Sequence, residues 1–180
     1  TLDRSSAASD VYKRQMYKLL EGKKIIVTGG TSGIGKAIAS IFVREGAIVV
    51  ILGTNKEKAI AAVKDIEGEN PDSSSCNYLI VDVADASAVE SALKEQIQEW
   101  GNHIDILVNC AGITSDKLLI RMTEEDWSRV VAVNLDSLFR VTKSVLPTMM
   151  KSRSGKIINI ASVIGTVSYT HLRAHETSLH

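Results

Sequence analysis

A glycine-rich stretch close to the start of the chain has the composition of a phosphate-binding turn. Residues 28–35 read TGGTSGIG, after the apolar run KKIIV and before a segment with apolar residues at helical spacing. Glycines let the backbone turn tightly and come close to a pyrophosphate, and the amides at a helix N-terminus then meet its negative charge. The stretch therefore predicts a nucleotide phosphate site between a first strand and a first helix.

Polar side chains recur at the ends of three later apolar runs and inside a long helical segment. Asp82 and Val83 close the third run, the tetrapeptide NCAG at 109–112 closes the fourth, Asn134 lies in the helical segment, and Ser162 follows the fifth run. Taken singly, Asp82 is equally a cap of the following turn, Asn134 a helix-bend or capping residue, and Ser162 a loop hydroxyl. Their joint register with the glycine turn favours one common site.

The elements that must position these residues follow from the apolar periodicity. Short Val/Ile/Leu-rich runs predict strands, and apolar residues every three to four positions predict helices. Thr123 can cap the longest helix, with Asp126 three residues later as its partner in a capping box. The expected strands are 23–30, 47–52, 77–83, 103–112 and 156–162, and the expected helices are 33–47, 56–69, 85–100 and 123 to about 151.

Strands and helices alternate along this whole segment. Near-continuous apolar strands joined by amphipathic helices predict a parallel sheet that is buried on both faces, with right-handed crossovers. The expected fold class is therefore α/β, a doubly wound parallel sheet of the Rossmann type. We expect the sheet to be incomplete after its fifth strand, with an uncovered edge there.

Composition excludes several classes of function. The chain has 180 residues, 44% of them hydrophobic, and 21 Lys and Arg residues balance 21 Asp and Glu residues. With no net charge and no basic cluster, we expect no nucleic-acid partner and no membrane partner. No apolar run approaches the roughly 20 residues of a membrane span. Cys76 and Cys110 lack metal-site spacing and fit reduced thiols, so we expect a cytoplasmic protein without a metal.

Both ends of the chain look foreign to the protein between them. Residues 1–15 lack periodicity and precede Met16. If residues 10–15 are written with the codons GAT GTG TAT AAG AGA CAG, the reverse complement contains GTC TCT TAT ACA CAT, which encodes VSYTH, the sequence of 167–171. An inverted repeat flanking an insert explains this match, and both ends resemble translated sequencing-adapter read-through. We therefore interpret 1–15 and 167–180 as non-native tails and 16–166 as the native domain.

This interpretation removes an apparent metal site. His171 and His175 are four residues apart, as two ligands on one helix face are, and Glu176 stands beside them, but all three fall in the C-terminal tail. Without the tail His103 is the only histidine, which leaves almost no material for a Ser-His-Asp arrangement.

In order and spacing, the motifs resemble those of the short-chain dehydrogenase/reductase family over essentially all of residues 16–166. They are TGxxxGIG at 28–35, Asp82 with Val83, NCAG at 109–112, Asn134 and Ser162. The stretches GITSDKLLIRMTEEDW, VNLDSLFRVTKSVLPTMMK and GKIINIASVIGTV are similar to the 3-oxoacyl-[acyl-carrier-protein] reductases of type II fatty acid synthesis. The resemblance implies that 16–166 is the NADP-binding Rossmann domain, the N-terminal part of such a reductase.

The resemblance also implies a role for each motif residue. Asp82 and Val83 would flank the adenine, Asn134 would help to hold a proton-relay water, and Ser162 would hydrogen-bond the substrate carbonyl. Asn134 and Ser162 are thus the catalytic candidates. Cys110 stands where the family has Asn or Cys, and without a basic partner it is not expected to be a nucleophile. The implied cofactor-binding residues are Gly29, Thr31, Ser32, Gly33, Ile34, Gly35, Thr54, Asp82, Val83, Asn109, Ala111 and Gly112.

The end of the second strand decides the choice of cofactor. NAD-preferring enzymes place an acid there to bind the ribose 2′-hydroxyl. This chain has Gly53, Thr54, Asn55 and Lys56 in that place, without a carboxylate and with a nearby cation, which favours NADP(H). Ser32 stands where many NADP-dependent members of the family carry Arg.

The family's reaction needs a Tyr-x-x-x-Lys pair, with the tyrosine about thirteen residues after the serine, to protonate the carbonyl and hold the ribose. Counting from Ser162 gives positions 175 and 179, which hold His175 and Leu179; Tyr169 and Arg173 imitate the pair but stand too close to Ser162. We expect this chain to be an inactive fragment of an NADP-dependent reductase. The alternatives are another carbonyl or alcohol oxidoreductase of the family and a non-catalytic nucleotide-binding protein of the same fold.

The resemblance finally implies the partners of the parent enzyme. Its substrate would be an acyl-carrier-protein thioester or another small carbonyl compound. Lys151, Arg153 and Lys156 either meet the acidic carrier or form a plain exposed helix end. The parent would be a homotetramer, assembled through helices 86–100 and 123–152.

Overall fold

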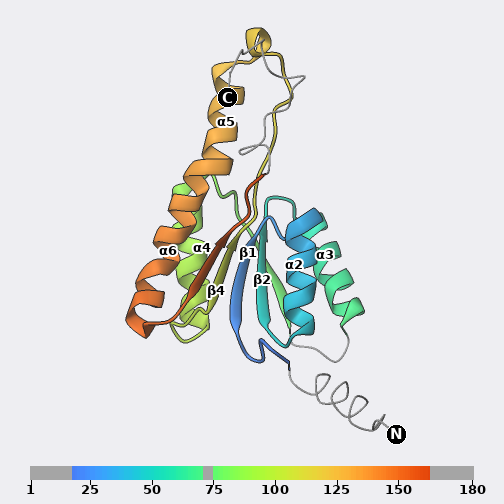
Figure 1. Cartoon of the computed structure of the whole chain (residues 1–180), viewed down its shortest axis with the longest axis vertical. Coiled ribbons are helices and arrows are strands. Elements are labelled where there is room, and N and C mark those ends of the chain that lie inside the picture. The colour runs from blue at the N-terminus through green and yellow to red at the C-terminus, as the bar shows by residue number, and fades with distance from the viewer. Residues whose placement is uncertain (1–17, 71–74, 163–180) are drawn as a thin grey trace, which may run out of the picture.

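The computed structural model describes residues 18–70 and 75–162. These residues form a five-stranded sheet with helices on both faces (Figure 1). The two segments interpreted as non-native, 1–15 and 167–180, lie outside the described residues, and so do residues 71–74 of the polar loop before the third strand.

All neighbouring strands of the sheet run parallel, in the order β3-β2-β1-β4-β5. Val27 of the central strand β1 pairs with Ile51 of β2 on one side and with Val108 of β4 on the other. The order reverses beside β1, and open α/β sheets bind ligands at such a switch point. The strands are β1 Lys24–Thr28, β2 Ile48–Gly53, β3 Cys76–Ile80, β4 Ile106–Asn109 and β5 Lys156–Asn159.

Helices α2 and α3 cover one face of the sheet, and α4 and α6 cover the other (Figure 1). β1 contributes to both cores, because Ile25 and Val27 pack on the α2 side and Ile26 on the α4 side, as the alternation of a strand requires. This confirms the doubly wound α/β fold. The helical elements are α2 Gly33–Arg44, α3 Lys56–Glu69, α4 Ala86–Glu99, the 3-10 turn η1 Leu119–Arg121, α5 Glu124–Val131, the π-helical turn η2 Ala132–Asp136 and α6 Ser137–Ser152.

Polar caps fix where three of the helices begin. Asn55 Oδ1 accepts the amide of Lys58 at 2.8 Å at the start of α3, and Asp85 caps α4. Thr123 and Asp126 form the predicted capping box at α5: Thr123 Oγ1 accepts the Asp126 amide at 3.2 Å, and Asp126 Oδ2 accepts the Thr123 amide at 3.1 Å. Each cap satisfies amides that a helix start leaves unpaired.

Four of the five strands are shorter than the apolar runs that predict them, and β2 has the predicted length but is shifted by one residue. β3 ends at Ile80, so Asp82 and Val83 follow the strand and do not close it. The cause is local: the Val81 amide makes the last bond to β2, at 2.9 Å, and Asp82 Oδ1 then accepts the Ala84 amide in a turn, also at 2.9 Å. The predicted helix from 123 to about 151 is likewise interrupted, by η2.

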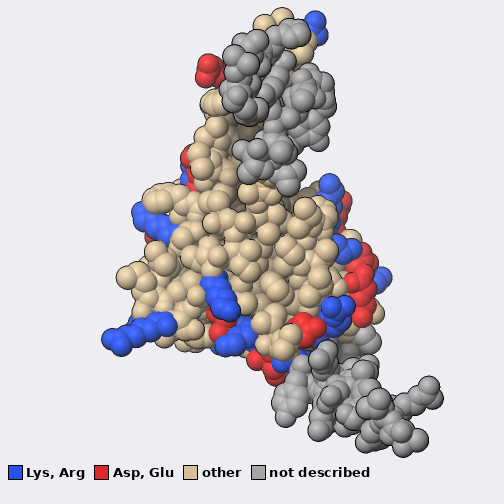
Figure 2. Space-filling model, in the orientation of Figure 1, with Lys and Arg blue, Asp and Glu red and all other residues tan. Residues whose placement is uncertain are grey.

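The outer strand β5 is much more exposed than its neighbour. Ile158 is 41% exposed, whereas Val108, its partner on β4, is fully buried. Beside this pair Ile38, Ile41 and Phe42 of α2 line an apolar cavity of about 200 Å³. In the same view, Figure 2 shows a mostly uncharged centre, with Lys, Arg, Asp and Glu gathered toward the sides and base. None of the described helices has the length and hydropathy needed to cross a membrane.

Candidate functional site

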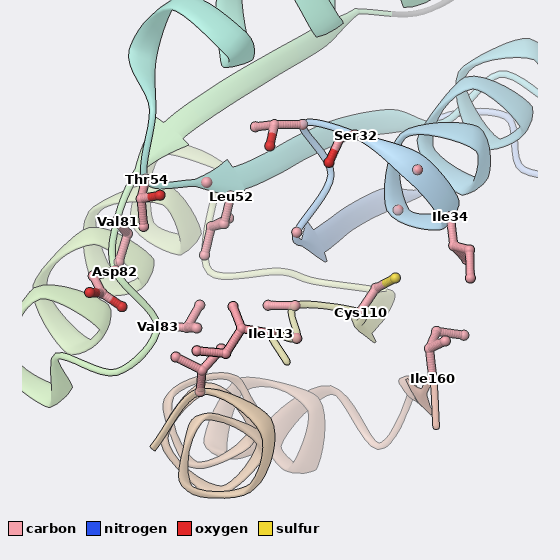
Figure 3. Close-up of a pocket in the computed structure, with 18 of the residues that line it drawn as sticks. Ser32, Ile34, Leu52, Thr54, Val81, Asp82, Val83, Cys110, Ile113 and Ile160 are labelled. Atoms are coloured by element: carbon pink, nitrogen blue, oxygen red, sulfur yellow. The ribbon is translucent and has the colours of Figure 1, made fainter. Parts of the chain in front are cut away.

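A cavity of about 420 Å³ lies at the carboxyl ends of β1, β2, β3 and β4 (Figure 3). Thr54, Val81 and Asp82 lie at one end of it, and Ile34 and Ile160 lie at the other. The structure brings eleven of the twelve predicted cofactor-binding residues into its wall: Gly29, Thr31, Ser32, Gly33, Ile34, Gly35, Thr54, Asp82, Val83, Ala111 and Gly112.

The glycine turn is shaped by backbone contacts that leave no room for side chains. Gly29 has a φ of +68°, and a Cβ there would lie 2.8 Å from the Cα of Ala111. A Cβ at Gly35 would overlap the carbonyl oxygen of Gly29. At Gly33, with a φ of +54°, a Cβ would meet no atom within 4 Å, so this part of the turn borders open space. Glycine therefore both closes the turn and leaves its backbone open to a ligand.

Helix α2 begins in the wall of the cavity. Ser32 is its N-cap, and the Ser32 carbonyl accepts the Lys36 amide at 3.2 Å, but the Ser32 side chain makes no capping bond. The first turn of α2 contains no acidic residue, so nothing there cancels the positive end of the helix macrodipole. The arrangement suits a phosphate group and keeps the Ser32 hydroxyl for a ligand.

Thr28 ties the glycine turn to the segment that follows β4. Its side chain is buried, and its Oγ1 accepts the amides of Cys110 and Ala111, both at 3.0 Å. These two bonds hold the turn and the NCAG segment at a fixed separation. In the sequence, Thr28 was recognised only as the first residue of the predicted turn. The sequence signal that could have indicated this role of Thr28 is a hydroxyl residue at the end of a buried apolar run.

The end of β2 presents a hydroxyl and no carboxylate to the cavity. Thr54 lines the wall, whereas the Asn55 side chain is engaged as the cap of α3. Lys56 and Glu57 open α3, so their side-chain charges nearly cancel and the positive helix end remains. An anionic group beside Thr54 would therefore meet no negative side chain of β2 or of the cap.

Asp82 and Val83 form the wall after β3. Asp82 Oδ1 accepts the Ala84 amide, and Asp82 Oδ2 accepts a hydrogen bond from Arg129 Nη2 at 2.9 Å. Asp82 thus caps the following turn, as its alternative interpretation predicts, and it also lines the cavity. Val83 is 6% exposed and belongs to the core on the α4 side.

Two predicted site residues, one buried and one exposed, are not among the residues that line the cavity. Asn109 is buried, and its Nδ2 donates to Asn159 Oδ1 at 2.8 Å, which joins β4 to β5. Asn134 lies in η2 and binds the backbone of Ile113 twice: its Oδ1 accepts the Ile113 amide at 2.8 Å, and its Nδ2 donates to the Ile113 carbonyl at 2.9 Å. Neither asparagine is among the residues that line the cavity. The helix-bend alternative for Asn134 also fits its place in a π-helical turn.

Ser162 lies beyond the lining of the cavity. The Ile160 amide donates to the Asn109 carbonyl at 2.9 Å, and Ile160 still lines the cavity. Ser162 follows it as an exposed residue outside the lining set. His175 and Leu179, at the positions of the family's Tyr and Lys, lie outside the described residues, as do Tyr169 and Arg173. The structure therefore gathers the cofactor residues but not the two catalytic candidates.

The cysteines are poor nucleophiles in this environment. Burial raises the pKa of the Cys110 thiol, and burial together with the charge of Glu67 raises the pKa of Cys76 to about 12. Thiols with raised pKa values carry little thiolate near neutral pH. Within the described ranges, no group of three or more His, Cys, Asp or Glu side chains is placed to hold a metal.

The wall also contains residues that sequence analysis did not single out. Most are apolar residues at or near strand ends, and the sequence pattern does not distinguish an apolar residue that faces the core from one that faces a cavity. Arg129 is the exception, because it brings a charge into the wall. The additional residues are Leu52, Val81, Ile113, Arg129, Val133 and Ile160. Gly53 and Cys110 also line the wall and lie in stretches that the sequence had pointed to.

Comparison with known sequences identifies the family. The short chain dehydrogenase family model matches residues 23–178, which reaches into the segment 167–180 interpreted as a tail. The 3-oxoacyl-[acyl-carrier-protein] reductase FabG of Thermotoga maritima is 43% identical over 146 residues, or 81% of this chain and 58% of that protein. FabG of Vibrio cholerae is 46% identical over 148 residues, or 82% and 58%. The chain thus spans little more than half the length of these relatives.

Solved structures give the same assignment. A short chain dehydrogenase from Mycobacterium smegmatis is 30% identical, with a TM-score of 0.77 over 84% of this chain and 63% of that one. An NAD+-bound xylitol dehydrogenase is 27% identical, with a TM-score of 0.76 over 84% and 57%. Fold and family together imply binding of a nicotinamide cofactor. The chain belongs to the short-chain dehydrogenase family.

Proposed function

We propose that the chain binds NADP(H) in the cavity at the carboxyl ends of β1 to β4. One observation carries the proposal: the glycine turn packs its backbone against Ala111 and leaves open space at Gly33, beside the N-terminus of α2. A bare backbone next to a helix start suits a pyrophosphate. Thr54 and Asp82 at the far end suit the ribose and the adenine.

The preference for NADP(H) over NAD(H) rests on the end of β2. A carboxylate there would bind the two ribose hydroxyls of NAD(H) and repel a 2′-phosphate. Thr54 offers a hydroxyl in its place, and the N-terminus of α3 adds a positive end nearby. Ser32 adds a second hydroxyl from the glycine turn.

Replacing Thr54 tests this preference. Thr54→Asp should weaken binding of NADPH by about tenfold, because the new carboxylate repels the 2′-phosphate, and should strengthen binding of NADH. Fluorescence titration of the reduced cofactors measures both affinities. Thr148→Asp on α6, away from this cavity, is the matched control. An unchanged NADPH-to-NADH ratio in Thr54→Asp would refute the role given to β2.

We further propose that the whole reductase reduces a 3-oxoacyl thioester on acyl-carrier protein to the 3-hydroxyacyl form, in fatty acid synthesis. The support is the printed names of the curated relatives, together with the family's motif order in this chain. The bound cofactor would supply hydride. Ser162 would hydrogen-bond the substrate carbonyl, and Asn134 would help to hold a proton-relay water in addition to its bonds to Ile113.

The chain itself is expected to be inactive. His175 and Leu179 stand where the reaction needs a tyrosine proton donor and a lysine. We expect no oxidation of NADPH with an acetoacetyl thioester above a buffer blank. Turnover by the chain would contradict this expectation.

The same two residues favour a second candidate, a non-catalytic nucleotide-binding protein of this fold. The DNA downstream of codon 166 discriminates between the candidates. An open frame that encodes Tyr-x-x-x-Lys at the expected spacing supports an enzyme fragment with non-native tails at 1–15 and 167–180, and a native stop codon contradicts it. A different carbonyl or alcohol substrate is the other alternative, and substrate profiling of the whole reductase decides it.

The partners and location follow as further proposals. Lys151, Arg153 and Lys156 are exposed at the end of α6 and the start of β5, where an acidic carrier protein could bind. The whole reductase is proposed to be a homotetramer, which the exposed Phe139 and Met150 of α6 support. Its proposed location is the cytoplasm, in line with the free thiols. Light scattering of the whole reductase measures its assembly.

A further inference from the structure

One ion pair stands in the wall of the cofactor cavity. Arg129 Nη2 lies 2.9 Å from Asp82 Oδ2, and both residues line the cavity. They are the only Asp, Glu, Lys or Arg residues in the lining set of the described chain. Arg129 belongs to the last turn of α5, and Asp82 follows β3, so the pair joins two elements that are far apart in the sequence.

Asp82 is held from both sides. Its Oδ1 accepts the Ala84 amide at 2.9 Å, and its Oδ2 accepts the bond from Arg129. Val83, the residue between Asp82 and Ala84, is buried and lines the cavity. The hydrogen bonds that orient the Asp82 carboxylate therefore also fix the position of Val83 in the cavity wall.

The charge of Asp82 matters for the ligand that the cavity is proposed to bind. A dinucleotide carries negative phosphates, and an unpaired carboxylate in the same cavity would repel them. Arg129 places its positive charge next to the Asp82 carboxylate and so offsets the negative potential that the carboxylate creates in the cavity. The Asp82 side chain is 37% exposed and the Arg129 side chain 49%, so the pair is reachable by a ligand and its contribution to folding is small.

A second contact fixes the helical region that carries Arg129. In η2, which directly follows α5, Asn134 binds the amide and the carbonyl of Ile113 at 2.8 and 2.9 Å. Ile113 and Val133 also line the cavity. The segment from α5 to η2 is thus attached to the cavity wall at two places, with Arg129 at one of them.

We propose that Arg129 is a positioning residue of the cofactor site, which orients Asp82 and neutralises its charge toward an anionic dinucleotide. The inference rests on the proposed binding of NADP(H). It assigns Arg129 an action through Asp82, because its guanidinium is directed to that carboxylate in the structure. Direct binding of a cofactor phosphate by Arg129 is the competing role that the experiment separates.

A double-mutant cycle on the full chain tests the inference by NADPH titration. Arg129→Ala should weaken binding by about threefold to tenfold, since it leaves the Asp82 charge uncompensated. Asp82→Asn keeps an oxygen that can accept the Ala84 amide but removes the negative charge. In that background, adding Arg129→Ala should change the NADPH affinity by less than about twofold. Arg44→Ala, which breaks the Arg44–Glu45 pair at 3.8 Å at the C-terminal end of α2, outside this cavity, is the matched control and should leave the affinity unchanged.

A second readout separates the proposed role from a merely structural one. In Arg129→Ala, the loss should be larger for adenosine 2′,5′-bisphosphate than for adenosine, because repulsion by Asp82 acts only on the anionic ligand, and the melting temperature should change little. Equal losses for both ligands, or equal losses in both backgrounds of the cycle, would overturn the inference. If the unsubstituted chain binds NADPH and Arg129→Ala binds it equally well, the inference alone fails. If the unsubstituted chain binds no NADPH, the proposed function fails with it.

Discussion

The two ends of the cavity at the carboxyl ends of the strands differ in how firmly their side chains are held. At the end toward β2 and β3, side chains are tied down: Asp82 is held by two bonds, and Asn55 and Asp85 cap the helices that follow. At the end toward β5, Ile160 is the lining residue, and Ser162 follows it as an exposed residue outside the cavity. We infer that cofactor binding and reaction depend on different parts of the chain. The described residues include eleven of the twelve proposed cofactor-binding residues in the cavity wall, whereas the proposed reaction needs groups beyond Ser162.

The largest expected effect comes from closing the glycine turn. Gly35→Val places a Cβ against the carbonyl oxygen of Gly29, where the backbone cannot yield. We expect loss of detectable NADPH binding and a destabilisation of about 3 kcal/mol or more. Calorimetric titration and urea unfolding measure the two effects.

Gly68→Ala in α3 is the control for this substitution, because a Cβ there meets no atom within 4 Å. It should stabilise the protein by about 0.5 to 1 kcal/mol, as Ala does in a helix interior, and leave binding unchanged. Normal NADPH affinity in Gly35→Val would show that the turn does not form the site.

Thr28 tests the link between the two halves of the site. Thr28→Val removes the hydroxyl that accepts the amides of Cys110 and Ala111 and leaves both without that partner. A loss of about 2 kcal/mol in unfolding free energy is expected, together with weaker NADPH binding. Thr28→Ser retains the hydroxyl and should restore most of both. If valine binds NADPH as well as threonine does, the hydroxyl does not position the site.

Asp105 lies at the amino ends of the strands, opposite the cavity, and separates stability from binding. Burial alone would raise the pKa of Asp105, but hydrogen bonds from the Lys23 side chain, the Lys24 amide and His103 outweigh burial and lower the pKa. Because the pKa is lower in the folded state than in the unfolded state, the ionised carboxylate stabilises the fold at pH values above about 4. This stabilisation is lost as the pH falls through the folded-state pKa.

Asp105→Asn should therefore reduce the unfolding free energy by about 1 kcal/mol at neutral pH and by less in acid, without changing NADPH affinity. Urea unfolding across pH measures this dependence. The exposed Asp116→Asn serves as the reference substitution. A cost for Asp105→Asn that does not depend on pH would exclude the charge as its cause.

The smallest effect is expected at the β5 edge. Ile158→Ala removes a side chain that is 41% exposed and should cost less than about 1 kcal/mol. Val108→Ala, at the paired position on β4, removes a fully buried side chain and should cost about 2 kcal/mol. Equal costs in thermal unfolding would mean that the edge is covered in solution.

Much of the fold could be predicted from the sequence, because apolar period and helix caps are local signals. α3 begins and ends where its pattern predicts, at Lys56 and Glu69, and the capping box at Thr123 is confirmed. Four of the five strands, all except β2, end earlier than their apolar runs predict, because the pattern does not show where pairing with the next strand stops. β3 illustrates this, since its apolar run continues past Ile80 into the turn at Asp82.

The part of the candidate site that could be predicted from the sequence is the glycine turn. The turn at 28–35 needs glycine for steric reasons that hold in any sequence. Arg129 was missed because its partner Asp82 stands 47 residues away, and no local pattern joins them. Asn109 was placed in the lining, but its amide instead spans β4 and β5, a choice that depends on which neighbour lies opposite.

We propose that this chain binds NADP(H) in the cavity at the carboxyl ends of the strands but lacks the groups that the reaction needs. Isothermal titration of the full chain with NADPH, followed by addition of an acetoacetyl thioester to the same sample, tests it most directly. We expect saturable binding, with NADPH favoured over NADH by about tenfold, and no oxidation of NADPH after the thioester is added. Absence of saturable binding, or binding followed by turnover, would contradict it.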